Sequence, residues 1–187
     1  MTSPPDRPDY RALLLAVDGL VPAPSGGHTE ALLRGAEASA RDALREQPVD
    51  RIPPVASWRE AYRAFGAKPQ RTRNSLEALL RRAGSGLPRV NRLTDLYNAI
   101  SVSHRIPVGG EDLTRYAGPP CRRWNWRQAR RTQLADDTSA ALFILDALDP
   151  VTDAALAAAA DELSAHLSLL GPDVRVARRL LGESIRP

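Results

Sequence analysis

Two short apolar runs, one near each end of the chain, limit most strongly the folds that this sequence can adopt. The first is residues 13–17 (Leu-Leu-Leu-Ala-Val), which Asp18 and Gly19 end. The second is residues 140–148, which Asp149 and Pro150 end. Apolar runs of this length between turn residues are typical of buried strands. Residues 173–181 fit either a further strand or a helix.

Five segments between and after these runs have the apolar spacing of amphipathic helices. Trp58, Ala61, Tyr62 and Phe65 share one face of the second, and we interpret this stripe as core rather than as a binding surface. Strands mixed with helices predict an α+β fold, with α/β as the alternative. We expect one domain over residues 10–181, with flexible termini at 1–9 and 182–187. The predicted helices cover residues 30–46, 58–65, 75–83, 92–104 and 151–170.

Positive charge is concentrated in the middle of the chain. Residues 51–131 carry 17 basic and 5 acidic side chains, whereas the flanking segments are both net negative. All but one of the 26 basic residues are arginine, which suggests a codon bias towards GC. Such a bias would not place the charge in one segment. The distribution therefore predicts a partner that is a polyanion.

The densest cationic stretch, residues 122–131, combines 5 arginines with 2 tryptophans. On a strand the tryptophans would share one face, and Arg123, Asn125 and Arg127 the other. Guanidinium groups donate to phosphates and indoles stack on bases, so the stretch predicts an RNA-binding surface. The alternative is a strand with its tryptophans in the core and its arginines in solvent. The predicted RNA-binding residues are Arg122, Arg123, Trp124, Asn125, Trp126, Arg127, Arg130 and Arg131.

Several other chemistries lack a sequence signal. No Walker loop and no Gly-x-Gly-x-x-Gly motif occurs, and Cys121 is the only cysteine. His28, His104 and His166 are far apart in the sequence, so we expect no metal site and no cofactor. No apolar run approaches a membrane span, and residues 1–6 do not resemble a secretion signal. We therefore expect a cytoplasmic protein without a membrane partner.

Five ordered motifs resemble the free-standing B3/B4 domain proteins, which are related to the editing module in the β subunit of bacterial phenylalanyl-tRNA synthetase. The resemblance covers roughly residues 10–180. The motifs are residues 58–69 (Trp-Arg-Glu-Ala-Tyr-Arg-Ala-Phe-Gly-Ala-Lys-Pro), 87–91 (Leu-Pro-Arg-Val-Asn), 95–101 (Asp-Leu-Tyr-Asn-Ala-Ile-Ser), 107–112 (Pro-Val-Gly-Gly-Glu-Asp) and 121–127 (Cys-Arg-Arg-Trp-Asn-Trp-Arg).

This resemblance implies an α+β fold with helices on a mixed sheet, and a pocket for the aminoacylated 3′ end of transfer RNA. The implied function is trans-editing, the metal-independent hydrolysis of mischarged aminoacyl-tRNA by a positioned water. Asn98, His104 and Gly109 would then lie near the reacting ester. The residues implied to shape the pocket are Asn91, Asp95 and Gly110, while Asn98 completes the Asn…Asp…Asn pattern of the synthetase module.

The chain departs from the synthetase module at two places. Gly109 stands where the module has a histidine in a turn, and only residues 113–120 separate the turn from the Cys-Arg-Arg-Trp motif, where relatives carry some tens of residues. The second departure shortens one wall of the pocket. Two alternatives follow: a non-catalytic RNA-binding or interaction domain that has lost the editing pocket, and a gene sequence that is incomplete and folds poorly.

Overall fold

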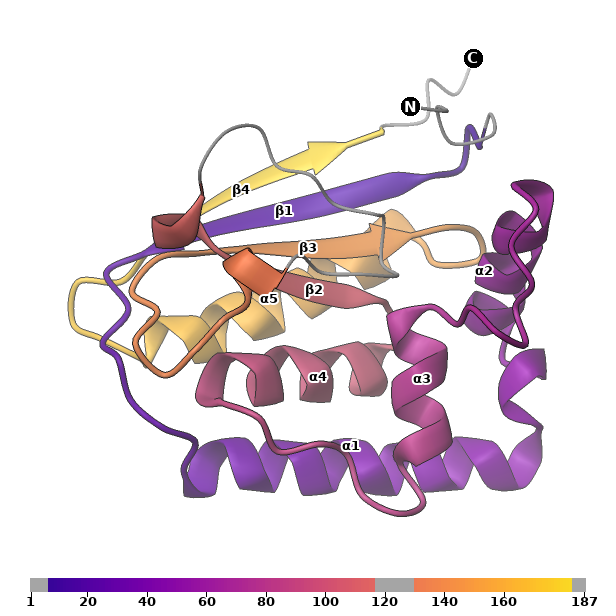
Figure 1. The fold of residues 1–187 in the computed structure, drawn as a ribbon, viewed down its shortest axis with the longest axis horizontal. Helices are drawn as coiled ribbons and strands as arrows, with labels where there is room; N and C mark the ends of the chain where they lie inside the picture. Colours follow the sequence, from indigo (N-terminus) through magenta and orange to yellow (C-terminus); the bar gives the residue numbers. More distant parts are fainter. Residues whose placement is uncertain (1–6, 117–129, 183–187) are drawn as a thin grey trace.

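The two apolar runs form neighbouring strands in the middle of a four-stranded sheet (Figure 1). β1 (Arg11–Asp18) lies between β3 (Ala141–Ala147) and β4 (Arg175–Leu181), and β2 (Val108–Asp112) is the edge strand beside β3. The three pairings are all antiparallel, whereas the expected sheet was mixed. The structure, a computed structural model, describes residues 7–116 and 130–182.

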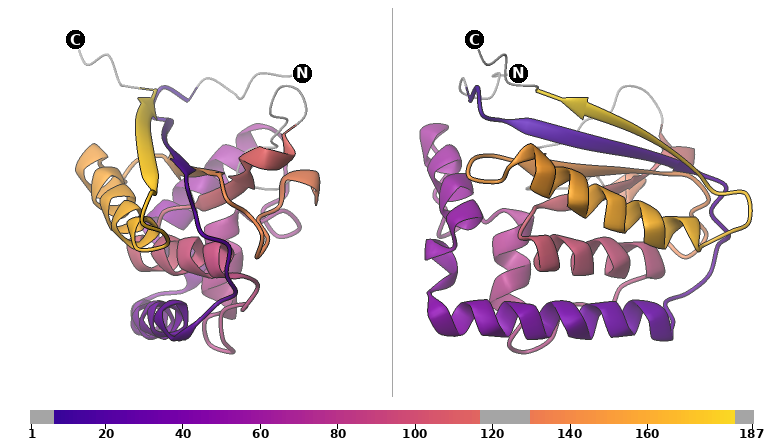
Figure 2. Two further views of the ribbon diagram at one scale, coloured as in Figure 1. Left: turned by 90° about the vertical axis from the view of Figure 1, so that its left-hand side faces the viewer. Right: turned by 180° about the vertical axis from the view of Figure 1, so that it is seen from behind.

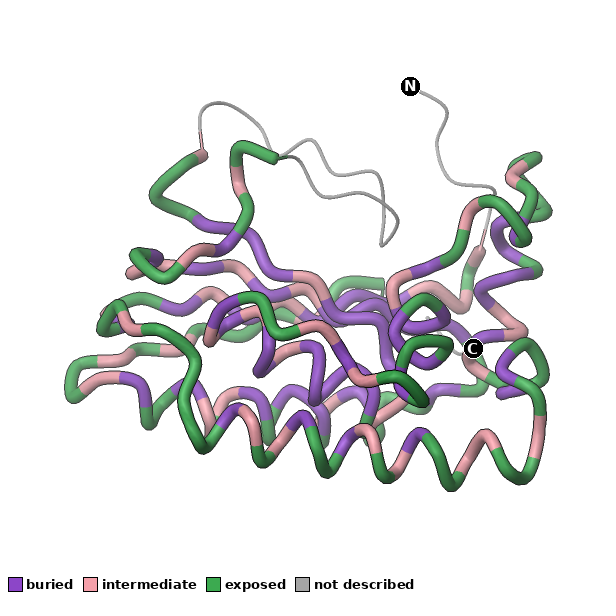
Figure 3. Tube along the Cα trace, turned by 60° about the horizontal axis from the view of Figure 1, so that its bottom comes forward, coloured by how far each residue is buried: buried purple, intermediate pink, exposed green. Residues whose placement is uncertain are grey.

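One face of the sheet is covered by helices. Successive side chains of a strand point to opposite faces, so Leu13, Leu15 and Val17 all face α4 (Arg92–His104) and α5 (Asp153–Ser168). α1 (Gly27–Glu46) lies on the far side of α4 from the sheet (Figures 1 and 2). Figure 3 shows the buried residues where the helices meet the sheet, with exposed residues recurring along α1. The α+β fold class is therefore confirmed.

The helical end of the molecule contains η1 (Val49–Arg51), α2 (Pro53–Ala64) and α3 (Ser75–Arg82). Three members of the predicted core stripe, Trp58, Ala61 and Tyr62, are at most 2% exposed and pack with Leu148. Tyr10 meets the Trp58 ring edge-on, with 6.4 Å between the ring centroids. Phe65, the fourth member, is 39% exposed, so the core interpretation is wrong for this residue.

Helix starts follow from capping side chains. Asn74 accepts a hydrogen bond from the Glu77 amide and Asn91 one from the Thr94 amide, as expected for N-caps. α2 begins at Pro53, five residues before the predicted start, because proline is tolerated in the first helical turn, where its missing N–H would have no partner. α1 begins at Gly27, earlier than the predicted residue 30.

Gly109 and Gly110 lie in strand β2, where the sequence predicted a turn. Both lack a positive φ, so the glycines are not needed for backbone conformation. At Gly110 an added Cβ would be 2.5 Å from Leu134 Cδ1 and 3.1 Å from the Phe143 ring. Close approach of the core therefore explains this glycine. β2 continues into η2 (Leu113–Arg115), and η4 (Arg130–Thr132) precedes β3.

Within the ranges that the structure describes, no helix combines the length and the apolar character needed to cross a membrane.

Candidate nucleic-acid interface

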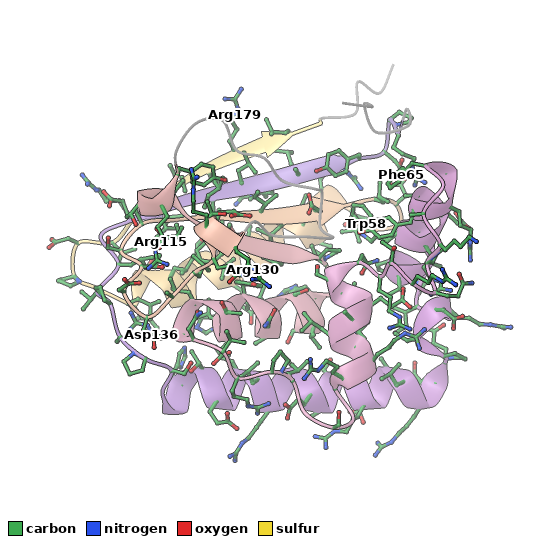
Figure 4. The ribbon with its side chains drawn as sticks, viewed as in Figure 1. Trp58, Phe65, Arg115, Arg130, Asp136 and Arg179 are labelled. Carbon is green, nitrogen blue, oxygen red and sulfur yellow. The ribbon has the colours of Figure 1, made fainter. Side chains whose placement is uncertain are left out.

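Most of the predicted RNA-binding stretch lies outside the described residues. Only Arg130 and Arg131 of that set are described, and both are exposed in η4. Nearby, Arg115 contacts Asp112 at 3.3 Å and Asp137 at 2.6 Å (Figure 4). Two carboxylates therefore neutralise the charge of Arg115. Outside the described residues are Arg122, Arg123, Trp124, Asn125, Trp126 and Arg127.

Several cations of the basic middle segment also have acidic partners in the fold. Arg89 contacts Glu30 at 3.0 Å and also pairs with Glu37, both of which lie on α1. The hydrogen bonds from Arg89 and Arg34 lower the pKa of Glu30 to about 2. Acidic residues of the N-terminal segment therefore cancel part of the positive charge that the sequence concentrates in the middle.

Arg59 and Arg105 serve the fold itself. Arg59 is 8% exposed and donates to Glu77 at 2.7 Å. Arg105 donates to the carbonyl oxygen of Ser39 at 2.9 Å, and burial lowers the pKa of its guanidinium. Neither side chain is placed to bind a phosphate in solvent.

A second group of cations remains open to solvent at the helical end of the molecule. Residues 51–83 carry eight basic and two acidic side chains, and one of the acids, Glu77, is fully buried against Arg59. Five of the basic side chains are exposed and form no ion pair with any residue that the structure describes. We call these five the helical-end cations: Arg51, Arg63, Lys68, Arg71 and Arg82.

An exposed aromatic ring accompanies these cations. Phe65 is 39% exposed at the end of α2, two residues after Arg63 and three before Lys68 (Figure 4). Its ring centroid lies 5.7 Å from that of Tyr62, so one side of the ring is supported by the core. Cations beside an accessible aromatic ring are a common feature of single-stranded nucleic-acid sites.

The Asn…Asp…Asn pattern lies along one face of α4. Asn91 caps the helix and its Nδ2 donates to the carbonyl oxygen of Leu134 at 2.8 Å. Asp95 accepts from the amide of Val90 at 2.7 Å and from the Ser25 hydroxyl at 2.5 Å. These bonds attach the start of α4 to three loops.

The structure does not bring the three residues expected near the ester into one place. Asn98 is 6% exposed within α4, and no described residue is hydrogen-bonded to its side chain. His104, the last residue of α4, contacts Glu162 of α5 at 2.7 Å. Gly110 faces Leu134 and Phe143 in the core, so the neighbouring Gly109 faces the opposite side of the sheet from α4.

Sequence reasoning missed two groupings. The helical-end cations are spread over 32 residues, and only Lys68 and Arg71 among them lie within three residues of each other in the sequence. The three histidines and Glu162 form one row of contacts, from His28 through His166 and Glu162 to His104, although 138 residues separate His28 from His166. No local pattern could have shown this convergence, because it needs the order in which α1, α4 and α5 pack. In the described ranges, no group of three or more His, Cys, Asp or Glu side chains could hold a metal ion.

Comparison with family models, with curated proteins and with solved structures finds no significant match for this chain.

Proposed function

We propose that the protein binds RNA, with the acceptor end of transfer RNA as the expected partner, through the helical-end cations. The observation that carries this proposal is that five exposed cations there have no acidic partner within the described ranges. The B3/B4 resemblance supports transfer RNA as the partner and the cytoplasm as its location. The arginine–tryptophan stretch at residues 122–131 stays a predicted RNA-binding segment, most of which lies outside the described residues.

Phosphate contacts supply most of the non-specific affinity for nucleic acids, because each cation that meets a phosphate releases a condensed counterion. A cation that already has a carboxylate partner must first give up that contact. Arg71 and Arg82 have no such partner among the described residues, so no ion pair with those residues has to be broken. Phe65 would stack on an unpaired base, and the single-stranded end of transfer RNA offers bases of this kind.

We propose RNA binding alone for this protein, without the trans-editing reaction. Hydrolysis of an aminoacyl ester needs polar groups held around one reacting carbonyl. Gly109 faces the side of the sheet opposite to α4, which carries Asn98 and His104, and His104 contacts Glu162. The placement of these residues favours the alternative of an RNA-binding domain without the editing pocket.

The test is a filter-binding titration of transfer RNA against the full chain at several salt concentrations. The variant Arg63→Gln/Arg71→Gln/Arg82→Gln removes three cations that form no ion pair within residues 7–116 and 130–182. Its matched control, Arg34→Gln/Arg45→Gln/Arg178→Gln, removes three exposed arginines that have acidic partners. Because both lose the same net charge, only contact with phosphate distinguishes them.

In the first variant we expect the slope of log K against log salt to fall in magnitude by about 2 to 3, since each phosphate contact contributes roughly 0.7 to 0.9 to that slope. The control should stay close to wild type. Absence of binding at low salt, or equal losses in both variants, would refute the proposal. A second experiment incubates the protein with mischarged transfer RNAs. Release of amino acid would show that the protein also hydrolyses the aminoacyl ester.

A further inference from the structure

Every histidine of the chain belongs to one row of contacts that joins three helices. Nε2 of His28, at the start of α1, lies 3.1 Å from Nδ1 of His166 on α5. Nε2 of His166 lies 3.9 Å from Oε1 of Glu162, one turn earlier on the same helix. Oε2 of Glu162 contacts Nε2 of His104, at the end of α4, at 2.7 Å. The RNA-binding proposal uses none of these residues.

The spacing of His28 and His166 fits a shared metal ion. A cation about 2.05 Å from each nitrogen would hold nitrogens 3.1 Å apart at an angle of roughly 100°, between octahedral and tetrahedral geometry. The same arrangement would place the ring centroids about 4.8 Å apart. The observed centroid distance is 5.0 Å, with 56° between the ring planes. A straight N–H···N hydrogen bond of this length would separate the centroids by about 5.4 Å.

The carboxylate is placed to orient one of the two rings. If Nδ1 of His166 binds a metal, its proton resides on Nε2, which points towards Glu162. A histidine that binds metal usually donates its other N–H to a carboxylate, which fixes the tautomer and the ring. Glu162 is itself held by His104.

We propose that His28 Nε2 and His166 Nδ1 bind a late first-row divalent cation of the type that prefers imidazole, such as Zn²⁺ or Ni²⁺, with solvent completing the coordination. Both rings are neutral before and after binding. The ring whose proton lies between them moves it to its other nitrogen, so the number of protons on the two rings is unchanged by binding. Loading the site would tie the start of α1 to the end of α5.

The experiment uses the untagged full chain, with ZnCl₂ and NiCl₂ as probes in calorimetric titration and in thermal unfolding at pH 7.5. Wild type should bind one equivalent. At free metal about 100-fold above the dissociation constant, its folding equilibrium constant should rise about 100-fold. His28→Gln and His166→Gln should each remove both effects, and because His28 is exposed, His28→Gln tests binding without disturbing the core. His104→Gln is the control, since it deletes a histidine that does not touch the metal.

Binding that survives in the variant His28→Gln/His166→Gln would overturn the proposal, as would absence of binding to wild type at millimolar metal. Loss of binding in His104→Gln equal to that in His28→Gln would also overturn it, because His104 acts only on Glu162. At pH 5.5 protons should compete with the cation and weaken binding in wild type, and a titration unchanged between the two pH values would contradict imidazole ligation.

Discussion

The buried pair Arg59–Glu77 is the contact whose removal we expect to cost most. Glu77 is fully buried, and one of its oxygens, Oε1, receives Arg59 at 2.7 Å and Arg81 at 3.0 Å. Its other oxygen, Oε2, has no hydrogen-bond partner within the described ranges. Replacing Arg59 by Met keeps an unbranched apolar stem at this position and removes the guanidinium group with its charge. The change leaves Glu77 buried with only the half-exposed Arg81 and the more distant Arg73.

The expected loss follows from the cost of leaving a charge buried without its partner. Breaking a buried ion pair from one side costs about 3 to 5 kcal/mol. Arg81 stays in contact with Glu77, so we expect Arg59→Met to cost about 3 kcal/mol, the lower end of that range. For a chain of this length, that corresponds to a fall of roughly 6 to 12 °C in the unfolding temperature. Substituting both residues, as Arg59→Met/Glu77→Leu, removes the buried charge and should restore most of the loss.

Urea and thermal unfolding of both single variants and the double variant would complete a double-mutant cycle. Arg45→Met is the control: Arg45 pairs with Asp42 in solvent, where an ion pair contributes about 0 to 1 kcal/mol. The reasoning fails if Arg59→Met changes stability by no more than Arg45→Met. It fails equally if the double variant is less stable than Arg59→Met alone.

Two further changes test the packing of β2 and the charges on α1. Gly110→Ala should destabilise the protein by about 1 to 3 kcal/mol, because the added methyl group would meet the Leu134 side chain. Gly35→Ala, where no atom lies within 4 Å of the added Cβ, should instead stabilise α1 by about 0.5 to 1 kcal/mol. Urea unfolding in which both changes had the same effect would contradict this reasoning. Arg89→Gln should destabilise the protein at pH 6 but not near pH 2. Arg89 and Arg34 together lower the folded-state pKa of Glu30 from 4.5 to about 2, so their stabilisation is present above pH 4.5 and is lost as the pH falls through 2. Arg89→Gln removes only the share that Arg89 contributes, and an equal deficit at both pH values in urea unfolding would rule this out.

Elements specified by local patterns were predicted well. Residues 13–17 and 140–148 became β1 and β3, and the helix predicted over 92–104 is α4, whose bounds are Arg92 and His104. Their apolar spacing is strong because both kinds of element present one side to the same core. β4 could not be assigned from sequence, since it is an edge strand whose apolar residues are half-buried or exposed. β2 contains paired glycines, and only the approach of Leu134 explains why Gly110 has no side chain.

The candidate site was less predictable, because charge pairing depends on residues that are far apart in sequence. Counting charges identified the basic middle segment, but it could not show that Arg89 would meet Glu30, 59 residues earlier. Nor could it show that Arg51 and Arg82 would remain without acidic partners among the described residues. Residues 122–127, the motif with the strongest sequence signal, lie outside the described ranges, so their role stays a prediction.

The strand order has a consequence for how the newly made chain reaches its native state. β1 is synthesised first, yet its two neighbours are residues 141–147 and 175–181, which leave the ribosome more than a hundred residues later. Until then, Leu13, Leu15 and Val17 have no sheet to join. Pairings between distant parts of a chain form slowly, and uncovered apolar strands aggregate in the meantime. Nascent chains halted before residue 175 should therefore depend on chaperones, whereas chains released after β4 is complete should fold without such help.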